Sequence, residues 1–193
     1  MTSRLVRVLM AVAIIAVGFA PMASHAQDDS QEETFLAVAH ARGNIQTRWN
    51  ERIEITIERW STPQETEDYI NLFKEQGRQA LVDAFQNNPP VGRVRVGQRL
   101  SYPLSFSRQF GAGGGKRTIR LATDRPIQGW EAVMQETTQR CAFSFMEFTL
   151  EADNTGEGYA IVGAKLTIDD EGQFHIESYD SAPLKLGSIR PGH

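Results

Sequence analysis

The sequence contains a single cysteine, Cys141, so the chain cannot form an internal disulfide bond. A catalytic thiol needs a nearby base and an electropositive setting, and the apolar run around Cys141 offers neither. We interpret this cysteine as a small buried hydrophobe. Basic residues are also in the minority, because 20 Lys and Arg stand against 24 Asp and Glu. This balance argues against nucleic acid or an anionic membrane surface as the partner.

Familiar catalytic and metal-binding motifs are missing as well. The sequence has no Gly-Xaa-Ser-Xaa-Gly segment, and its histidines after residue 26 are too far apart for a metal motif: His40, His175 and His193. The glycine-rich stretch 111–115 precedes Lys116, but Phe110 and Arg117 stand where a P-loop needs Gly and Ser or Thr. We therefore predict a plain hairpin loop there, and we assign no catalytic residue, metal or cofactor.

The N-terminus has the pattern of an export signal. Arg4 and Arg7 precede an apolar run of 12 residues, 8–19, and Ser24-His25-Ala26 supplies small residues at a cleavage site. A membrane-spanning helix needs about 20 apolar residues, so this run is short for a permanent anchor, although an uncleaved anchor is the alternative. We predict a signal peptide over residues 1–26 and a secreted protein of the bacterial periplasm or the extracellular space.

Cleavage after Ala26 would leave 167 of the 193 residues and, with Arg4 and Arg7 removed, would change the formal charge from −4 to −6. Residues 27–33 carry four acids and no apolar residue, which predicts an acidic disordered linker. The remaining residues, 34–193, are enough for one hydrophobic core. We predict a single β-rich domain there, and no integral membrane segment after cleavage.

A strand followed by a helix forms the best-specified part of the chain. Isoleucines at every second position of 51–60 predict a strand with one buried face. A helix start follows: Thr62 is the expected N-cap, Pro63 suits the first helical position, and Glu65 completes a capping box with Thr62. An apolar stripe runs through 69–85, and Gly77 inside it predicts a kink or a break.

From residue 91 onward, short alternating segments between Gly-rich and Asp-rich turns predict antiparallel strands. Leu100, Tyr102, Leu104 and Phe106 are expected on one face of a strand, with serines on the other. In 141–151 the apolar period slips, which predicts either a β-bulge near Glu147 or burial on both faces. The predicted fold is α+β or mostly β: a sandwich or open barrel of about eight antiparallel strands with one long helical segment, either continuous or broken, after the second strand.

Several segments follow one another in a distinctive order: the exported N-terminus, the segment Ile57-Glu-Arg-Trp-Ser-Thr62, the helix with a central glycine, Val91-Gly-Arg-Val94, Ile119-Arg-Leu-Ala-Thr-Asp-Arg-Pro-Ile127 with Trp130-Glu131, and a glycine-punctuated C-terminal meander. Together these segments resemble a family of small exported bacterial β-rich proteins of unknown function. The resemblance covers most of residues 34–189. It implies export and transfers no activity, cofactor or site residue.

The candidate ligand-binding residues are Trp60, Arg120, Asp124 and Trp130. They would form a polar patch beside two tryptophans at the mouth of a pocket, whereas a structural proline turn around Asp124 is the alternative. We predict a non-catalytic module that binds a small molecule or a protein of the cell envelope. The alternatives are a hydrolase or isomerase whose site is assembled from distant residues, and a structural or interaction protein of the envelope.

Overall fold

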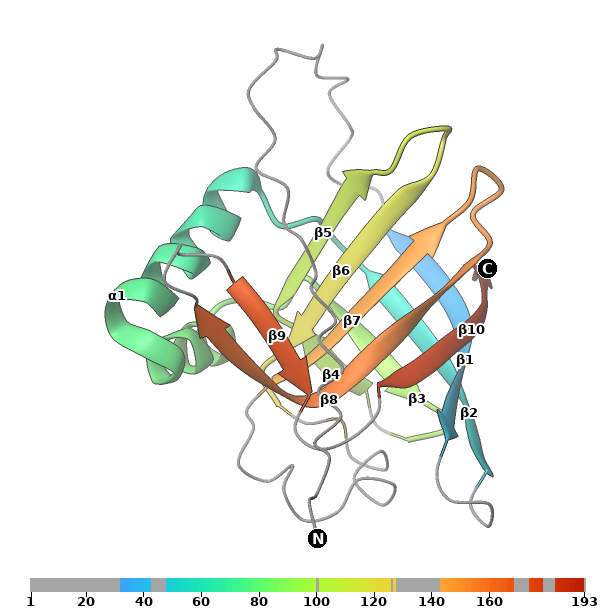
Figure 1. The fold of residues 1–193 in the computed structure, drawn as a ribbon, viewed down its shortest axis with the longest axis horizontal. Coiled ribbons are helices and arrows are strands. Elements are labelled where there is room, and N and C mark those ends of the chain that lie inside the picture. Colours follow the sequence, from blue (N-terminus) through green and yellow to red (C-terminus); the bar gives the residue numbers. More distant parts are fainter. Residues whose placement is uncertain are drawn as a thin grey trace, which may run out of the picture.

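The computed structural model describes residues 32–42, 48–99, 101–125, 127, 143–168, 174–178 and 183–192. Within these residues the chain forms ten strands and one helix, shown in Figure 1. The elements are β1 (Glu33–Arg42), β2 (Arg48–Ile57), α1 (Pro63–Asn87), β3 (Gly92–Val96), β4 (Ser101–Leu104), β5 (Phe106–Gly111), β6 (Arg117–Thr123), β7 (Phe143–Leu150), β8 (Gly156–Ile168), β9 (Phe174–Ser178) and β10 (Leu184–Pro191).

The strands form one antiparallel sheet that curls into a nearly closed barrel. Its order is β4-β3-β2-β1-β10-β8-β7-β6-β5, and β9 pairs with β8 off this path. The two ends of this order, β4 and β5, are consecutive in the chain and are separated only by Ser105, whose N–H donates to the carbonyl of Ala122 at 2.9 Å. The sequence prediction of a mostly antiparallel β fold with one helix after the second strand is confirmed.

The barrel interior is filled with side chains. Alternation along β1, β2, β6 and β7 directs every second residue inward, and these residues form one buried cluster with Trp60, Val91 and Ile127. Phe35 and Phe148 meet inside it edge to face, with ring centroids 5.6 Å apart. The largest side chains that are less than 2% exposed include Ile53, Ile55, Ile57, Leu104, Ile119, Leu121 and Met146.

Both faces of β7 are buried, which explains the period slip in its sequence. Met146, Phe148 and Leu150 belong to the barrel interior, whereas Phe143 and Phe145 lie in a second cluster on the outside. β7 itself pairs without a slip across Glu147. The irregularity lies opposite Phe143 and Ser144, where β8 inserts Gly163 with φ of 67°. The expected alternative of burial on both faces is therefore right, and a bulge near Glu147 is wrong.

Helix α1 begins where the sequence predicts. The hydroxyl of Thr62 accepts from the N–H of Glu65, and the Glu65 carboxylate accepts from the N–H of Thr62, which completes the capping box. Gly77 interrupts the helix with φ of 80° and ψ of −170°, so the predicted break is confirmed. A Cβ at Gly77 would meet nothing within 4 Å. Glycine is therefore favoured there by the left-handed backbone and not by lack of space.

The helix packs against the outer face of the barrel wall and does not fill its interior. Phe73, Leu81, Val82 and Phe85 form the second cluster with outward side chains of β5 to β8, namely Phe106, Ala122, Phe143, Phe145 and Leu166. Figure 1 shows α1 along one flank of the barrel. Edge-to-face contacts join Phe85 to Tyr69 and to Phe143, with ring centroids 5.0 and 5.7 Å apart. The kink at Gly77 leaves both halves of the helix in this cluster.

The segment between β4 and β5 differs from its predicted alternation. Leu104 is buried in the barrel and Tyr102 packs against that cluster, but Phe106 lies in the outer cluster under α1. Ser105 sits outside both strands and interrupts the alternation between them. The prediction that Phe106 shares a face with Leu104 is therefore wrong.

Candidate functional site

The structure separates the predicted ligand-binding residues among different environments. Trp60 is 6% exposed and belongs to the barrel interior. Arg120 lies on β6 one residue from Ile119 and Leu121, both of which face inward, so its side chain projects from the outer face. Trp130 lies outside the described residues. A shared pocket mouth for Trp60 and Arg120 is not formed, because they occupy opposite sides of the barrel wall.

Asp124 forms a structural ion pair in the turn after β6. Its side chain is only 1% exposed and accepts from Arg125 at 2.8 and 2.6 Å, whereas the Arg125 side chain is 52% exposed. The hydrogen bonds that Arg125 donates to Asp124 raise the pKa of Arg125, and the nearby negative charge of Asp124 adds to this effect. The backbone of the same turn is held by Thr123 and Ser144, whose hydroxyls both donate to the carbonyl of Arg125. The interpretation of Asp124 as part of a structural turn fits this geometry.

Arg120 belongs to a row of polar side chains that crosses the outer wall. Sheet register places Arg108 opposite Arg120, Arg120 opposite Glu147, Glu147 opposite Tyr159, and Tyr159 opposite Lys185. We call these five residues the outer-wall row. They come from five neighbouring strands, β5, β6, β7, β8 and β10.

The centre of the outer-wall row is tightly bonded. Nε of Arg120 donates to Glu147 at 2.6 Å, and the Tyr159 hydroxyl donates to the other carboxylate oxygen at 3.0 Å. The guanidinium of Arg120 also lies 5.0 Å from the ring centroid of Phe110. Phe110 is 41% exposed, one of two large exposed hydrophobic side chains in the described part of the chain, with Ile176. Arg, Tyr and Phe are residue types enriched at protein interfaces.

Burial and the neighbouring carboxylate keep Tyr159 protonated. Desolvation is the largest cause, followed by the charge of Glu147 and its hydrogen bond, and together they raise the pKa of Tyr159 to about 12. Such a phenol is a hydrogen-bond donor at neutral pH and a poor general base. The Arg120–Glu147–Tyr159 group thus presents a protonated phenol and a carboxylate that accepts hydrogen bonds on both oxygens.

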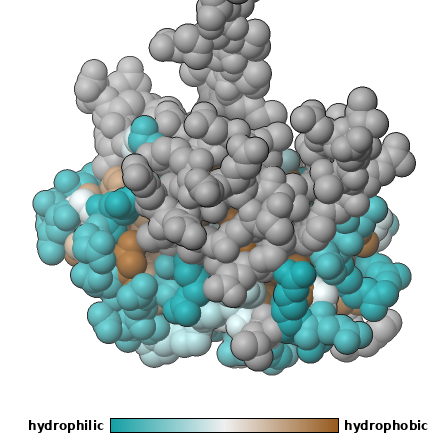
Figure 2. Space-filling model, turned by 90° about the horizontal axis from the view of Figure 1, so that it is seen from below, coloured by the Kyte–Doolittle hydropathy of each residue, from teal (hydrophilic) through white to brown (hydrophobic). Residues whose placement is uncertain are grey.

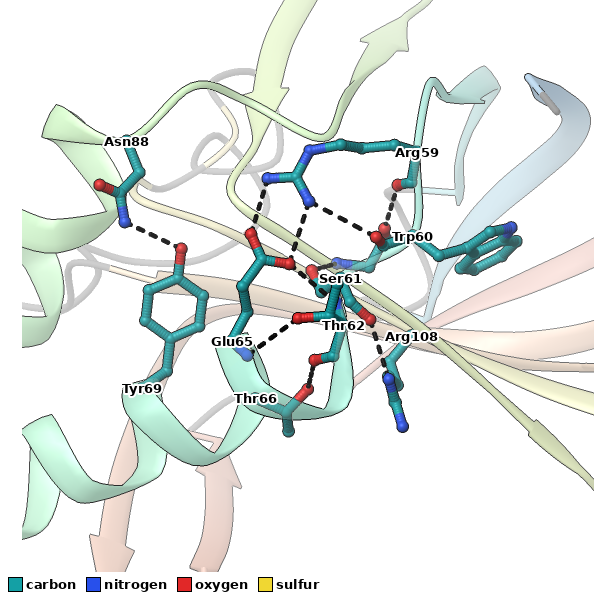
Figure 3. A network of polar contacts seen from close by, with 10 residues as sticks. Arg59, Trp60, Ser61, Thr62, Glu65, Thr66, Tyr69, Asn88 and Arg108 are labelled. Atoms are coloured by element: carbon teal, nitrogen blue, oxygen red, sulfur yellow. Dashed lines mark hydrogen bonds and ion pairs between the residues drawn. The ribbon is translucent and has the colours of Figure 1, made fainter. Parts of the chain in front are cut away.

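A second polar network stabilises the junction between β2 and α1, the segment that contains the candidate residue Trp60. Figure 3 shows Arg59 reaching over the first turn of α1 to Glu65. Arg59 is the main cause of the lowered pKa of Glu65, and the hydrogen bond from the Thr62 backbone contributes to it. Arg108 donates to the carbonyl of Ser61 at 2.9 Å, which ties the junction to the outer-wall row.

Ser105 and Ser107, two of the serines expected on the polar face of a strand, are buried, whereas Ser101 is exposed. Ser107 is fully buried, its hydroxyl donates to the carbonyl of Arg59 at 2.7 Å, and its backbone bonds in both directions to Ser61. The N–H groups of Glu58 and Arg59 also donate to the carbonyl of Val91. The junction thus joins β5 to the start of β3. The sequence around a serine that is buried by such long-range contacts does not distinguish it from an exposed serine.

The described residues line shallow surface depressions. One, of about 680 Å³, lies over the β7–β8 turn and β10 and is open to solvent; another, of about 290 Å³, lies beside Arg52, Glu54 and Arg95. The first contains Glu151 and Glu157, but each of these carboxylates pairs with an exposed lysine, Lys116 and Lys185 respectively. A pair of carboxylates set up for acid–base catalysis is not formed there.

Two further features bear on the class of protein. No group of three His, Cys, Asp or Glu side chains in the described part of the chain has the arrangement of a metal site. The helix in these ranges is too polar to cross a bilayer. Figure 2 shows one side of the molecule, on which the described surface is mostly hydrophilic with separated hydrophobic residues.

Comparison with models of protein families, with curated proteins and with solved structures gave no match to this chain. The function must therefore be inferred from the geometry of the molecule.

Proposed function

We propose that the mature protein is an exported, non-catalytic binding module that recognises a protein of the cell envelope through the outer-wall row, which lies beside the part of the wall that α1 covers. The observation that carries this proposal is the outer-wall row with Phe110 beside it. Phe110 supplies an exposed aromatic ring. The row supplies the bonded group of Arg120, Glu147 and Tyr159, with Arg108 and Lys185 at its two ends.

The filled barrel interior favours a protein partner over a small apolar ligand. Lipid- and ligand-carrying barrels keep space inside, whereas here inward residues from most strands are less than 2% exposed, Phe35 and Phe148 among them. The α1 helix packs on the outside of the wall, where its apolar side chains contact Phe106, Phe143 and other outward residues.

The charge of the outer-wall row indicates the chemistry of the partner. The row contains three basic residues and one acidic residue. Glu157, which pairs with Lys185 at the edge of the row, reduces the local net charge to +1, although the whole chain has a formal charge of −4. A surface of locally positive charge with an aromatic anchor is complementary to a partner surface that offers carboxylates around an apolar contact.

Site-specific photo-crosslinking in the native host tests this proposal. A photoreactive amino acid at Phe110 should give a discrete adduct with one envelope protein, and Arg120→Ser in the same chain should reduce its yield severalfold. The matched control places the photoreactive residue at Arg95, which lies on β3 and forms a comparable exposed ion pair with Glu54 at 2.7 Å. Equal adducts from both positions, or none from Phe110, would contradict the proposal.

The export on which the proposal depends has a separate test. The intact mass of the protein recovered from the periplasm or the medium should correspond to a chain that begins at Gln27. A mass that still includes residues 1–26 would overturn the predicted cleavage.

A further inference from the structure

Arg117, the first residue of β6, forms a second polar site on the inward side of the wall. Arg117 lies two residues before the inward-facing Ile119, and Glu33 lies two residues before the inward-facing Phe35. Their side chains are 21% and 25% exposed. The site therefore lies where β1 and β6 begin, on the opposite side of the wall from the outer-wall row.

The two terminal nitrogens of the Arg117 guanidinium each donate two hydrogen bonds, one to Glu33 and one to a neutral side chain. Nη1 and Nη2 of Arg117 donate to the two carboxylate oxygens of Glu33, at 2.9 and 2.5 Å. Nη1 also donates to the side-chain oxygen of Gln109 at 3.1 Å, and Nη2 to that of Asn154 at 2.9 Å. One hydrogen of each nitrogen thus orients the arginine, and the other faces the carboxylate.

The orienting groups are independent of Glu33. Gln109 belongs to β5 and Asn154 to the turn between β7 and β8, and the guanidinium lies 5.6 Å from the ring centroid of Phe35. Neutral oxygens on both sides and an aromatic ring on one face fix the planar fork in the geometry that binds a carboxylate through both oxygens. A side chain oriented in this way loses little additional freedom when it binds.

We propose that Arg117, Gln109 and Asn154 form a carboxylate-binding site that the chain fills with its own Glu33. Glu33 is the first residue of β1, and strand ends open locally at low free-energy cost. A carboxylate from another molecule takes its place when the start of β1 moves away. The contact with Glu33 then limits binding to ligands that outcompete a tethered carboxylate.

Rescue of Glu33→Ala by acetate tests the site on the full mature chain. Acetate should raise the thermal midpoint of this variant in a saturable manner, beyond the effect of chloride at equal ionic strength, because a ligand that binds only the folded state stabilises it. The wild-type protein should respond much less at the same concentrations. Glu33→Gln, which keeps the shape of the side chain, provides a second background if the alanine variant does not fold.

Changes in the orienting groups distinguish this site from adventitious binding. In the Glu33→Ala background, Arg117→Lys should weaken the apparent acetate affinity by roughly tenfold, because lysine lacks the planar fork. Asn154→Gly should also weaken it, since glycine tolerates the φ of 60° at this position but removes the oxygen that holds Nη2. Arg95→Gln in the same background should leave the affinity unchanged.

Peptides separate the two sources of such a carboxylate. A short peptide with a free C-terminal carboxylate that rescues better than acetate, while its amidated form does not, would identify a chain terminus as the ligand; equal rescue by acetate would identify a small carboxylate. The proposal fails if acetate acts no better than chloride on Glu33→Ala and Glu33→Gln, or equally on the wild type and the Arg117→Lys double variant.

Discussion

The guanidinium of Arg59 and the carboxylate of Glu65 face each other through two hydrogen bonds, at 2.9 and 3.0 Å, across the first turn of α1. The same carboxylate accepts from the N–H of Thr62 at 2.7 Å. The Glu65 side chain thus fastens the start of the helix both to its own cap and to Arg59, which follows the end of β2.

Glu65→Gln should reduce stability in a manner that depends on pH. Arg59, chiefly, lowers the pKa of Glu65 below the ordinary value of 4.5. A carboxylate with a lowered pKa stabilises the fold above its unfolded pKa, and this contribution is lost as the pH falls through the lowered value. The difference in free energy of unfolding between wild type and variant should therefore be present at about pH 7 and should vanish towards about pH 2. Urea denaturation at several pH values measures it, with Glu67→Gln, an exposed acid of the same helix, as control.

Gly77→Ala should destabilise the protein. Alanine in place of glycine within a regular helix gains about 1 kcal/mol, but at a positive φ it costs about 1 kcal/mol or more. Since Gly77 has φ of 80° and open space around it, strain and not steric overlap determines the result. Chemical denaturation measures whether the free energy of unfolding rises or falls, with Gln76→Ala in the same helix as control. A gain in stability for Gly77→Ala would mean that α1 is continuous in solution.

Gly158→Ala should destabilise the barrel through direct overlap. A Cβ at this position would lie 2.1 Å from the carbonyl oxygen of Glu147 and 2.5 Å from Cα and Cβ of Phe148. Overpacking of this kind costs about 1–3 kcal/mol. Gly111→Ala is the matched control, because a Cβ there meets nothing within 4 Å and its φ is not in the left-handed region. The free energies of unfolding of both variants should differ accordingly, and similar values would argue against the close approach of β7 and β8.

Tyr159 should ionise at a higher pH than an ordinary tyrosine. Burial and Glu147 raise its pKa from 10.0 to about 12, so Tyr159→Phe should remove a component near pH 12 from the phenolate absorbance titration. Glu147→Gln should move that component down. A group with a raised pKa stabilises the folded state below its unfolded value, so this contribution should fall as the pH rises from 10 towards 12.

The local signals of the sequence predicted local structure well. The capping box at Thr62 and Glu65, the break at Gly77 and the buried isoleucines of β2 are all present, because each depends on residues close together in the chain. Leu104 is buried as its place in the alternating segment predicts, and it ends the short strand β4, next to the interruption at Ser105.

The candidate site could not be assembled from the sequence for a physical reason. Trp60 and Arg120 each lie among polar and aromatic residues in the sequence, which suggested a common site. The direction in which each side chain points is set by the sheet, and it places Trp60 inside the barrel and Arg120 outside. Register likewise sets Arg120 opposite Glu147 and Tyr159. The buried serines and the Glu33–Arg117 pair depend on contacts between residues 48 and 84 positions apart.

The sequence by itself thus determined the antiparallel class of fold, the start and break of the helix, and the positions that are apolar enough to be buried. The tertiary structure alone decided that the sheet nearly closes, that α1 packs on its outer wall, and which charged residues meet. Helix caps and strand alternation depend on residues that are close together in the sequence. Barrel closure and the choice of ion-pair partners depend on strand register, which is fixed only when distant segments pack together.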